Sequence, residues 1–97
     1  MANALLSIQI IPKTPNGEDV IPYVDRAIEV IQTSGVKHQV NALETTMEGE
    51  LAELLDIVRR MNEAVHEFGS GSIISQVKIL YNPDGVSMDK LTEKYRP

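Results

Sequence analysis

The chain has 97 residues, 42% of them hydrophobic and 24% charged, which is typical of one globular domain and not of a disordered segment. Fourteen acidic residues against nine basic ones give a formal charge of −5, so we do not expect nucleic acid as a partner. The absence of cysteine excludes disulfides, thiolate metal sites and a cysteine nucleophile. No stretch has the pattern of a signal peptide or a membrane span, which predicts a cytoplasmic protein without a membrane partner.

The first predicted strand covers residues 4–11. Its apolar side chains alternate with polar ones, so that Leu6, Ile8 and Ile10 share one face while Ser7 and Gln9 share the other. This alternation predicts a strand that is buried on one side only.

The first predicted helix begins near Asp19, which can cap it, and ends at Ser34 and Gly35. Pro22 is tolerated in the first turn, where a missing N–H costs nothing. Tyr23 lies near the edge of the apolar stripe and suits either the core or its rim. The stripe consists of Val20, Val24, Ala27, Ile28 and Ile31.

Two short strands, 36–42 and 43–48, are expected to pair as a hairpin, and a fourth strand is expected over 72–81. Between them, the helix over 51–68 has the clearest apolar periodicity. The tail, residues 86–97, suits either a short helix capped by Ser87 or a frayed end. The apolar stripe of the second helix consists of Leu51, Leu54, Leu55, Val58, Met61, Val65 and Phe68.

The predicted order of strand, helix, strand, strand, helix, strand is typical of the α+β ferredoxin-like fold, here as one domain over residues 1–97. In this fold two helices pack on one face of a four-stranded antiparallel sheet, and strands one and three are central. Ser7 and Gln9 are then expected beside Thr45 on the third strand.

The second face of the sheet is expected to be uncovered and to carry Ile11, Val77 or Leu80. A small domain rarely leaves such an apolar face in water. We therefore expect a homo-oligomer, in which either paired edges or stacked sheets bury this surface.

The segment 43–51 changes from a strand pattern to a helix pattern at Gly49, where a flexible backbone permits a sharp turn. With its neighbours it resembles the small thiamine-binding (YkoF-like) protein family over residues 5–81. The resembling segments, in order, are Ser7-Ile-Gln-Ile-Ile-Pro12, Pro22-Tyr-Val, Ser34-Gly35, Thr45-Thr-Met-Glu-Gly49-Glu and Ser75-Gln-Val-Lys-Ile79.

The resemblance implies a ferredoxin-like subunit assembled as a dimer or a tetramer. It also implies binding of thiamine or its hydroxymethylpyrimidine moiety as a ligand, with no other cofactor and no catalysis. Thiamine joins a cationic thiazolium to an aminopyrimidine, so its site needs a carboxylate, neutral hydrogen-bond partners and an apolar or aromatic wall.

Glu48 can supply that carboxylate, although a carboxylate at this position also suits the start of the next helix. Ser7, Gln9, Thr45 and Thr46 are the candidate hydrogen-bonding residues. Thr45 and Thr46 point to opposite faces of their strand, and threonine is also simply a good strand former.

Tyr23, Gln76 and Lys78 are additional candidates for ligand contact. A lysine on a covered face needs a carboxylate partner, so an ion pair is the simpler role for Lys78. His38 and His66 lack metal-ligand spacing, and we expect no metal site.

Two other functions remain open at the level of sequence. One is a metabolite-sensing or oligomeric regulatory domain, whose exposed face binds a partner. The other is a small ferredoxin-like enzyme, which is disfavoured because the sequence offers no nucleophile–base set, phosphate loop or spaced carboxylate pair.

Overall fold

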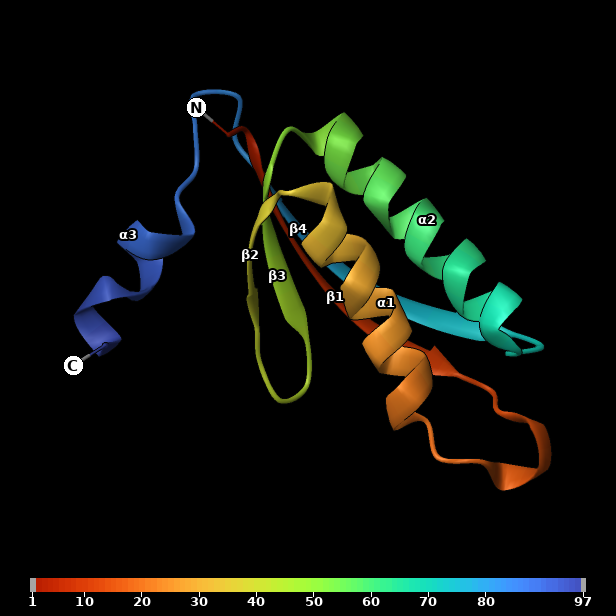
Figure 1. Cartoon of the computed structure of the whole chain (residues 1–97). Helices are drawn as coiled ribbons and strands as arrows, with labels where there is room; N and C mark the ends of the chain where they lie inside the picture. The colour runs from red at the N-terminus through yellow and green to blue at the C-terminus, as the bar shows by residue number, and fades with distance from the viewer. Residues whose placement is uncertain (1, 97) are drawn as a thin grey trace.

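The computed structural model describes residues 2–96 and contains a four-stranded antiparallel sheet with strand order β2-β3-β1-β4 (Figure 1). The α+β ferredoxin-like prediction is confirmed, with β1 and β3 at the centre of the sheet. The elements are β1 (Ala4–Pro12), α1 (Ile21–Ser34), β2 (Lys37–Val40), β3 (Thr45–Gly49), α2 (Leu51–Phe68), β4 (Ile73–Tyr81) and α3 (Met88–Thr92), with single 3-10 turns at Pro15–Gly17 and Glu93–Tyr95.

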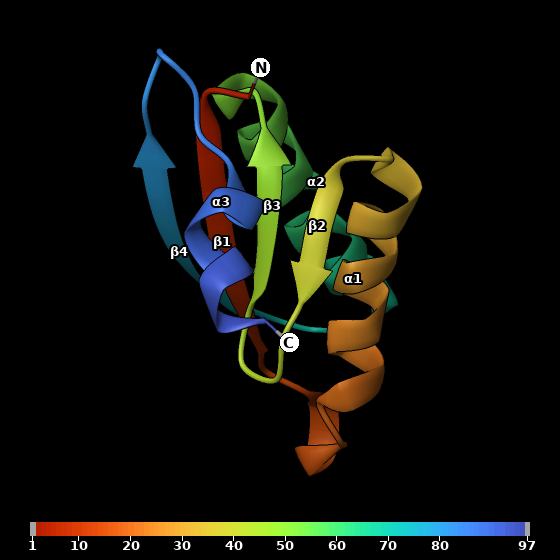
Figure 2. The same ribbon diagram turned by 90° about the vertical axis from the view of Figure 1, so that its left-hand side faces the viewer.

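The core lies between the sheet and the helices α1 and α2, which run together on one side of it (Figure 2). Alternate residues of β1 enter this core because successive side chains of a strand point to opposite faces. Its main members are Leu6, Ile8, Ile10, Tyr23, Ala27, Ile31, Met47, Leu54, Ile57, Met61 and Val65.

The stripe of α2 differs at three positions from the sequence prediction. Ile57 is fully buried although the predicted stripe left it out, whereas Leu55 and Phe68 are about half exposed. Leu55 faces the β4 side of the helix, as does Asn62, whose amide oxygen accepts from the hydroxyl of Ser75. Phe68 is the last residue of the helix, and its ring contacts that of Tyr23 while about half of it stays exposed.

Tyr23 belongs to the core. Its ring meets the ring of Phe68 edge to face, with centroids 4.9 Å apart, and its hydroxyl donates to Glu18 Oε2 at 2.7 Å. The adjacent carboxylate raises the pKa of the Tyr23 hydroxyl above its ordinary value. The tyrosine therefore packs on the helix side of the sheet.

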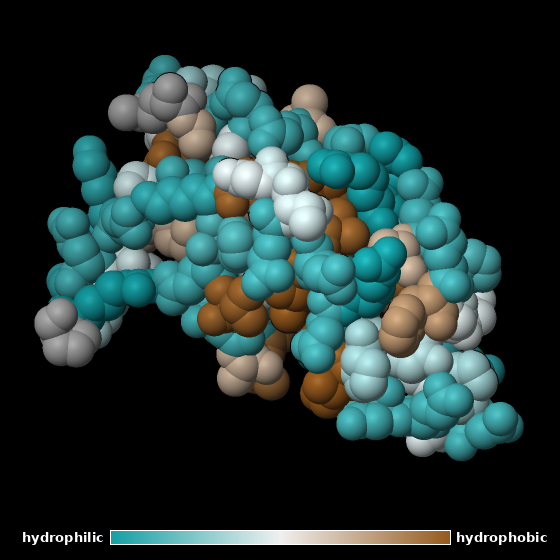
Figure 3. Space-filling model, in the orientation of Figure 1, coloured by the Kyte–Doolittle hydropathy of each residue, from teal (hydrophilic) through white to brown (hydrophobic). Residues whose placement is uncertain are grey.

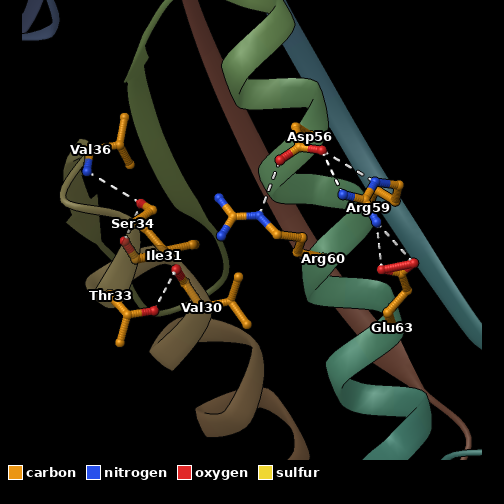
Figure 4. A network of polar contacts seen from close by, with 9 residues as sticks. All are labelled: Val30, Ile31, Thr33, Ser34, Val36, Asp56, Arg59, Arg60 and Glu63. Carbon is orange, nitrogen blue, oxygen red and sulfur yellow. Dashed lines mark hydrogen bonds and ion pairs between the residues drawn. The ribbon is translucent and has the colours of Figure 1, made fainter.

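Figure 4 shows the polar contacts that finish α1. The hydroxyl of Ser34 donates to the carbonyl of Ile31 at 2.6 Å and accepts from the N–H of Val36 at 3.2 Å. Gly35 adopts the left-handed conformation, with φ of +77°, that ends helices.

The same view shows ion pairs on the outer side of α2, where Arg59 bridges Asp56 and Glu63. All three side chains are about half exposed to water, so these pairs add little stability. We read this side of α2 as a solvated surface.

Gly49 is required for space and not for an unusual backbone conformation. Its φ lies outside the positive region. A Cβ at this position would approach Leu54 Cδ2 to 3.2 Å and Val36 Cγ2 to 3.3 Å. The junction between β3 and α2 is therefore a point of close approach between the chain and the core.

The strand register corrects two expectations. Ser7 lies opposite Thr46, not Thr45. Val77 lies opposite Ile8 and therefore shares the helix face, whereas Ile11 and Leu80 do belong to the other face. The first difference follows from the hairpin, whose connection spans residues 41–44 and delays the start of β3 to Thr45. The second follows from strand alternation, which places Val77 and Leu80, three residues apart, on opposite faces of β4.

The C-terminal segment crosses the second face of the sheet, which the sequence analysis left uncovered (Figure 2). Ser87 caps α3 by accepting from the N–H of Lys90 at 3.2 Å, and Met88 is buried beneath the helix. Asp89 forms an ion pair with Lys37 of β2. The segment thus covers the β2 and β3 side of this face. No helix in residues 2–96 combines the length and apolarity needed to cross a membrane.

Candidate functional site

The face of the sheet opposite α1 and α2 carries a mixed set of polar and apolar side chains, and we call it the open face. Residues directly opposite each other in an antiparallel ladder share a face, so the register assigns its members. They are Leu5, Ser7, Gln9 and Ile11 of β1, Thr46 and Glu48 of β3, and Ile74, Gln76, Lys78 and Leu80 of β4.

Four side chains in the middle of the open face form a hydrogen-bonded group, which we call the polar cluster: Ser7, Glu44, Thr46 and Lys78. The Ser7 hydroxyl donates to Glu44 Oε2 and lies 3.0 Å from Thr46 Oγ1. Lys78 Nζ donates to Glu44 Oε1 at 2.9 Å. β1 and β4 thus each place a hydrogen-bond donor on the carboxylate of the hairpin residue Glu44, and β3 adds the Thr46 hydroxyl beside Ser7.

The Glu44 carboxylate is held in its ionised form. The hydrogen bond from Ser7 is the largest cause that lowers its pKa below the ordinary value of glutamate, followed by the hydrogen bond from Lys78. A carboxylate in this state accepts hydrogen bonds from amines and attracts cations.

Two shallow hollows flank the polar cluster, and Lys78 lines both. One, of ≈ 250 Å³, is also bordered by Leu5, Ser7, Thr46, Ile79 and Leu80. The other, of ≈ 340 Å³, is bordered by Gln9, Glu44, Gln76 and Val77. Their volumes are at or below the low end of the roughly 300–1,000 Å³ usual for ligand pockets, so a ligand here needs a further wall.

The structure brings Ser7, Gln9, Thr46, Gln76 and Lys78 to this region of the open face. Glu48 also faces this side, but its Oε1 accepts from the N–H of Met88 at 2.7 Å, so it lies under the C-terminal segment.

Thr45 and Tyr23 lie on the other side of the sheet, and both are buried. Thr45 lines a separate hollow of ≈ 200 Å³ between the β2–β3 hairpin and the start of α1. That hollow is mostly apolar, with Val20, Ile21, Val24 and Leu43 among its lining residues, and Figure 3 shows apolar atoms gathered near the hairpin tip.

Glu44 is the member of the polar cluster that the sequence analysis did not name. The signal was present, since Glu44 stands two residues before Thr46 and four before Glu48, with the spacing that places all three on one face. It was obscured because Glu44 lies in the connection just before β3, where alternation is a weaker guide.

Both histidines are engaged with backbone carbonyls. His38 Nδ1 lies 2.9 Å from the carbonyl of Val36, and His66 Nδ1 lies 2.8 Å from that of Ser70. Among residues 2–96, no three histidine or acidic side chains gather in a way that could hold a metal ion.

Comparisons with known proteins agree on one family. Residues 6–96 match the family model described as thiamine-binding protein. A UPF0045 protein of Clostridium perfringens is 44% identical over 91 residues, which cover 94% of this chain and 95% of that protein.

Solved structures share the fold over nearly the whole chain. A domain of unknown function, DUF77, from Bacillus cereus is 43% identical, with a TM-score of 0.91 over 98% of this chain and 91% of that one. A candidate thiamine biosynthesis/salvage protein from Thermotoga maritima is 31% identical, with a TM-score of 0.87 over 97% of this chain and 99% of that one. The chain therefore belongs to the thiamine-binding protein family.

Proposed function

We propose that this protein binds thiamine or its hydroxymethylpyrimidine moiety reversibly on the open face, without catalysis. The observation that carries the proposal is the ionised Glu44 carboxylate, which accepts from Ser7 of β1 and from Lys78 of β4, with the Thr46 hydroxyl of β3 beside Ser7. Membership of the thiamine-binding family and the likeness to the candidate thiamine biosynthesis/salvage protein of Thermotoga maritima support the same ligand class.

The chemistry of the polar cluster suits an aminopyrimidine. The exocyclic amine of the ligand donates to Glu44, and the hydroxyls of Ser7 and Thr46 can donate to or accept from ring nitrogens. Lys78 is 77% exposed, so its ammonium group can leave Glu44 at little cost when a ligand amine takes its place.

Apolar side chains beside the cluster provide a surface for the heterocycle. Leu5 and Leu80 flank the smaller hollow, whereas Gln9 and Gln76 offer amide groups beside the larger one. The net charge of −5 further favours a cationic ligand such as thiamine over an anionic one.

The composition of the cluster supports binding without turnover. It contains one carboxylate, one lysine and two hydroxyls, and the carboxylate is held ionised, which makes it a poor general acid near neutral pH. The same lowered pKa makes Glu44 a weak general base, so its hydrogen bond from Ser7 does little to activate that hydroxyl as a nucleophile.

We further propose that the protein self-associates as a dimer or a tetramer. The support is that the hollows are open and that apolar side chains of the open face, Ile11, Ile74 and Leu80, remain exposed beside them. A second copy would supply the missing wall.

Isothermal titration calorimetry with thiamine and with hydroxymethylpyrimidine tests the proposal. The wild-type protein should bind at least one of them saturably. Glu44→Gln should weaken binding about 10- to 100-fold, because it removes a charge-assisted hydrogen bond worth roughly 1.5–3 kcal/mol.

Glu48→Gln is the matched control, since it alters a carboxylate on the same face that is already engaged by Met88. It should change the affinity less than about threefold. Absence of binding to the wild-type protein at millimolar ligand would reject the proposed function. Weakening by Glu48→Gln alone would move the site to the region beneath α3.

A further inference from the structure

The C-terminal segment, residues 86–96, lies on the open face, which also carries the polar cluster (Figure 2). Its side-chain partners on β2 and β3 are Lys37, Gln39 and Glu48. The register places all three on the open face, because Lys37 pairs with Glu48 and Gln39 pairs with Thr46. The segment therefore lies beside the proposed ligand site and not on a separate surface.

One buried side chain anchors the segment to the sheet. Met88 is 5% exposed, whereas Leu91 and Tyr95, further along the segment, are 55% and 76% exposed. Of the buried apolar side chains in the described part of the chain, only Met88 and Leu5 lie outside the main core. Leu5 belongs to the open face and lies directly opposite Glu48, whose carboxylate accepts from the N–H of Met88. These positions place Met88 beside Leu5, on the face away from the core.

The polar ties of the segment to β2 are exposed to water. Lys37 and Asp89 form an ion pair, but both side chains are about half exposed or more, so the pair adds little stability. At the start of the segment, the N–H of Val86 donates to the carbonyl of Ala2 at 3.0 Å, which gives a fixed point next to β1. The segment can therefore leave the sheet by local opening, without disruption of the main core, which contains none of its residues.

The area beneath the segment adjoins the smaller of the two hollows, the one of ≈ 250 Å³. Leu5 borders this hollow and is already covered, with 8% of its surface exposed. Glu48 lies two residues from Thr46 on the same face of β3, which is about 7 Å along the strand. Because the hollow is smaller than the roughly 300–1,000 Å³ of ligand pockets, a heterocycle that rests on Leu5 needs the space that Met88 fills.

We infer that the C-terminal segment opens and closes over the open face, and that the closed segment blocks ligand binding by holding Met88 over Leu5. This regulation rests on the proposed function, because it acts at the same site. A ligand that needs the open segment binds in proportion to the fraction of molecules in which the segment is open. By reciprocity, bound ligand must shift the segment toward its open state.

Amide hydrogen exchange followed by NMR measures the opening without ligand. The N–H of Met88 is protected by Glu48 only while the segment is closed, so its exchange rate reports the open fraction. In the wild-type protein this N–H should exchange by local opening, and low concentrations of urea should hardly change its rate. The N–H of the fully buried Leu6 should exchange only by global unfolding and should therefore respond to urea. A Met88 N–H that follows Leu6 in urea would overturn the inference.

Met88→Ala keeps the backbone N–H at position 88 but removes most of the apolar anchor. It should raise the exchange rate of that N–H about 10- to 100-fold, which is the shift expected when a buried side chain of this size is lost. Leu91→Ala is the matched control, because it removes an apolar side chain of the same helix that is already exposed. It should change the rate less than about threefold. An equal rise in both variants would show that Met88 is not the anchor and would overturn the inference.

Isothermal titration calorimetry with hydroxymethylpyrimidine tests whether the closed segment blocks the site. Met88→Ala should bind this ligand more tightly than the wild-type protein, by the same factor by which its exchange rate rises, since both quantities scale with the open fraction while most molecules are closed. Leu91→Ala should bind like the wild-type protein. In the wild-type protein, saturating hydroxymethylpyrimidine should also speed the exchange of the Met88 N–H. Slower exchange with ligand would mean that the segment closes on the ligand, and it would overturn the inference.

The two measurements separate this inference from the proposed function. If exchange at position 88 is local and rises in Met88→Ala, but neither protein binds thiamine or hydroxymethylpyrimidine at millimolar concentration, the segment opens as inferred and the proposed function fails. If the wild-type protein binds saturably and Met88→Ala binds no more tightly despite its faster exchange, the proposed function stands. In that case ligand and closed segment do not compete, and the inference is overturned.

Discussion

Glu44 is the residue on which the proposed site depends most, because its carboxylate receives hydrogen bonds from both Ser7 and Lys78. Those contacts lower its pKa in the folded protein below the value that it has in the unfolded chain. A carboxylate with a lowered pKa contributes stability at pH values above its unfolded pKa, and this contribution is lost as the pH falls through the folded pKa. The wild-type protein should therefore lose its stability advantage over Glu44→Gln in acid.

The corresponding measurement is a pH titration of the glutamate side-chain carbons by NMR. Glu44 should titrate below the ordinary range, and Ser7→Ala should shift its pKa upward, because the serine hydroxyl is the largest cause of the lowering. Lys78→Met should produce a further but smaller rise. A Glu44 that titrates at the ordinary value in the wild-type protein would mean that the polar cluster does not form in solution.

Gly49 is a second residue whose role is local and testable. A methyl group at this position meets Leu54 and Val36 at distances tighter than ordinary van der Waals contact. Gly49→Ala should therefore destabilise the protein by about 1–3 kcal/mol, as other overpacked positions do. Gly71 has no heavy atom within 4 Å of its would-be Cβ, so Gly71→Ala is the control and should have a much smaller effect on the urea midpoint. Equal effects of the two substitutions would contradict the prediction, because they would show that Leu54 and Val36 move aside for the added methyl group.

At the scale of elements, α2 contributes the deepest side chains of the core, and its burial pattern makes a quantitative prediction. Ile57 is fully buried, whereas Leu55 is about half exposed on the β4 side. Ile57→Ala should cost about 2–5 kcal/mol in the free energy of unfolding, because it leaves a cavity. Leu55→Ala should cost less than about 1 kcal/mol. Urea denaturation of both variants measures the difference. A larger loss of unfolding free energy for Leu55→Ala than for Ile57→Ala would mean that the opposite side of α2 packs against the sheet.

The periodicity of the sequence predicted the elements well where a strand or helix has two distinct sides. The α2 helix was predicted over its full length because its ends are marked by Gly49 and Gly69. The stripe itself was less accurate, since Leu55 on the β4 side of the helix and Phe68 at its last position are apolar but only about half covered. Periodicity reports which residues are apolar, but only packing decides which of them are covered.

The register of the strands and the position of the tail were beyond the reach of the sequence. A one-residue change in the hairpin decides whether Thr45 or Thr46 lies beside Ser7, and the residues of the connection do not specify a turn type. The contact between Glu48 and the N–H of Met88 joins residues forty positions apart, so no local pattern could indicate it. These two facts explain why the sequence analysis named Glu48 and not Glu44 as the candidate carboxylate.

At the scale of the whole molecule, the hydrophobic core covers one face of the sheet, whereas the other face is only partly covered. The C-terminal segment crosses this second face and contacts β2 and β3, while the polar cluster, the two hollows and the edge strand β4 lie beside it (Figure 2). This arrangement places the proposed ligand site next to Ile11, Ile74 and Leu80, the exposed apolar side chains that we expect a second copy to cover. A dimer and a binding site would thus arise from one exposed region.

The most direct test of this account is a titration of the isotope-labelled protein with hydroxymethylpyrimidine, followed by amide and side-chain NMR shifts. The account predicts saturable shifts centred on Ser7, Gln9, Thr46 and Gln76 of the open face. Shifts centred instead on the hollow between the hairpin and α1, at Val24, Leu43 and Thr45, would contradict the proposed site. An unchanged spectrum with thiamine as well as with hydroxymethylpyrimidine at millimolar concentration would contradict ligand binding by the open face altogether.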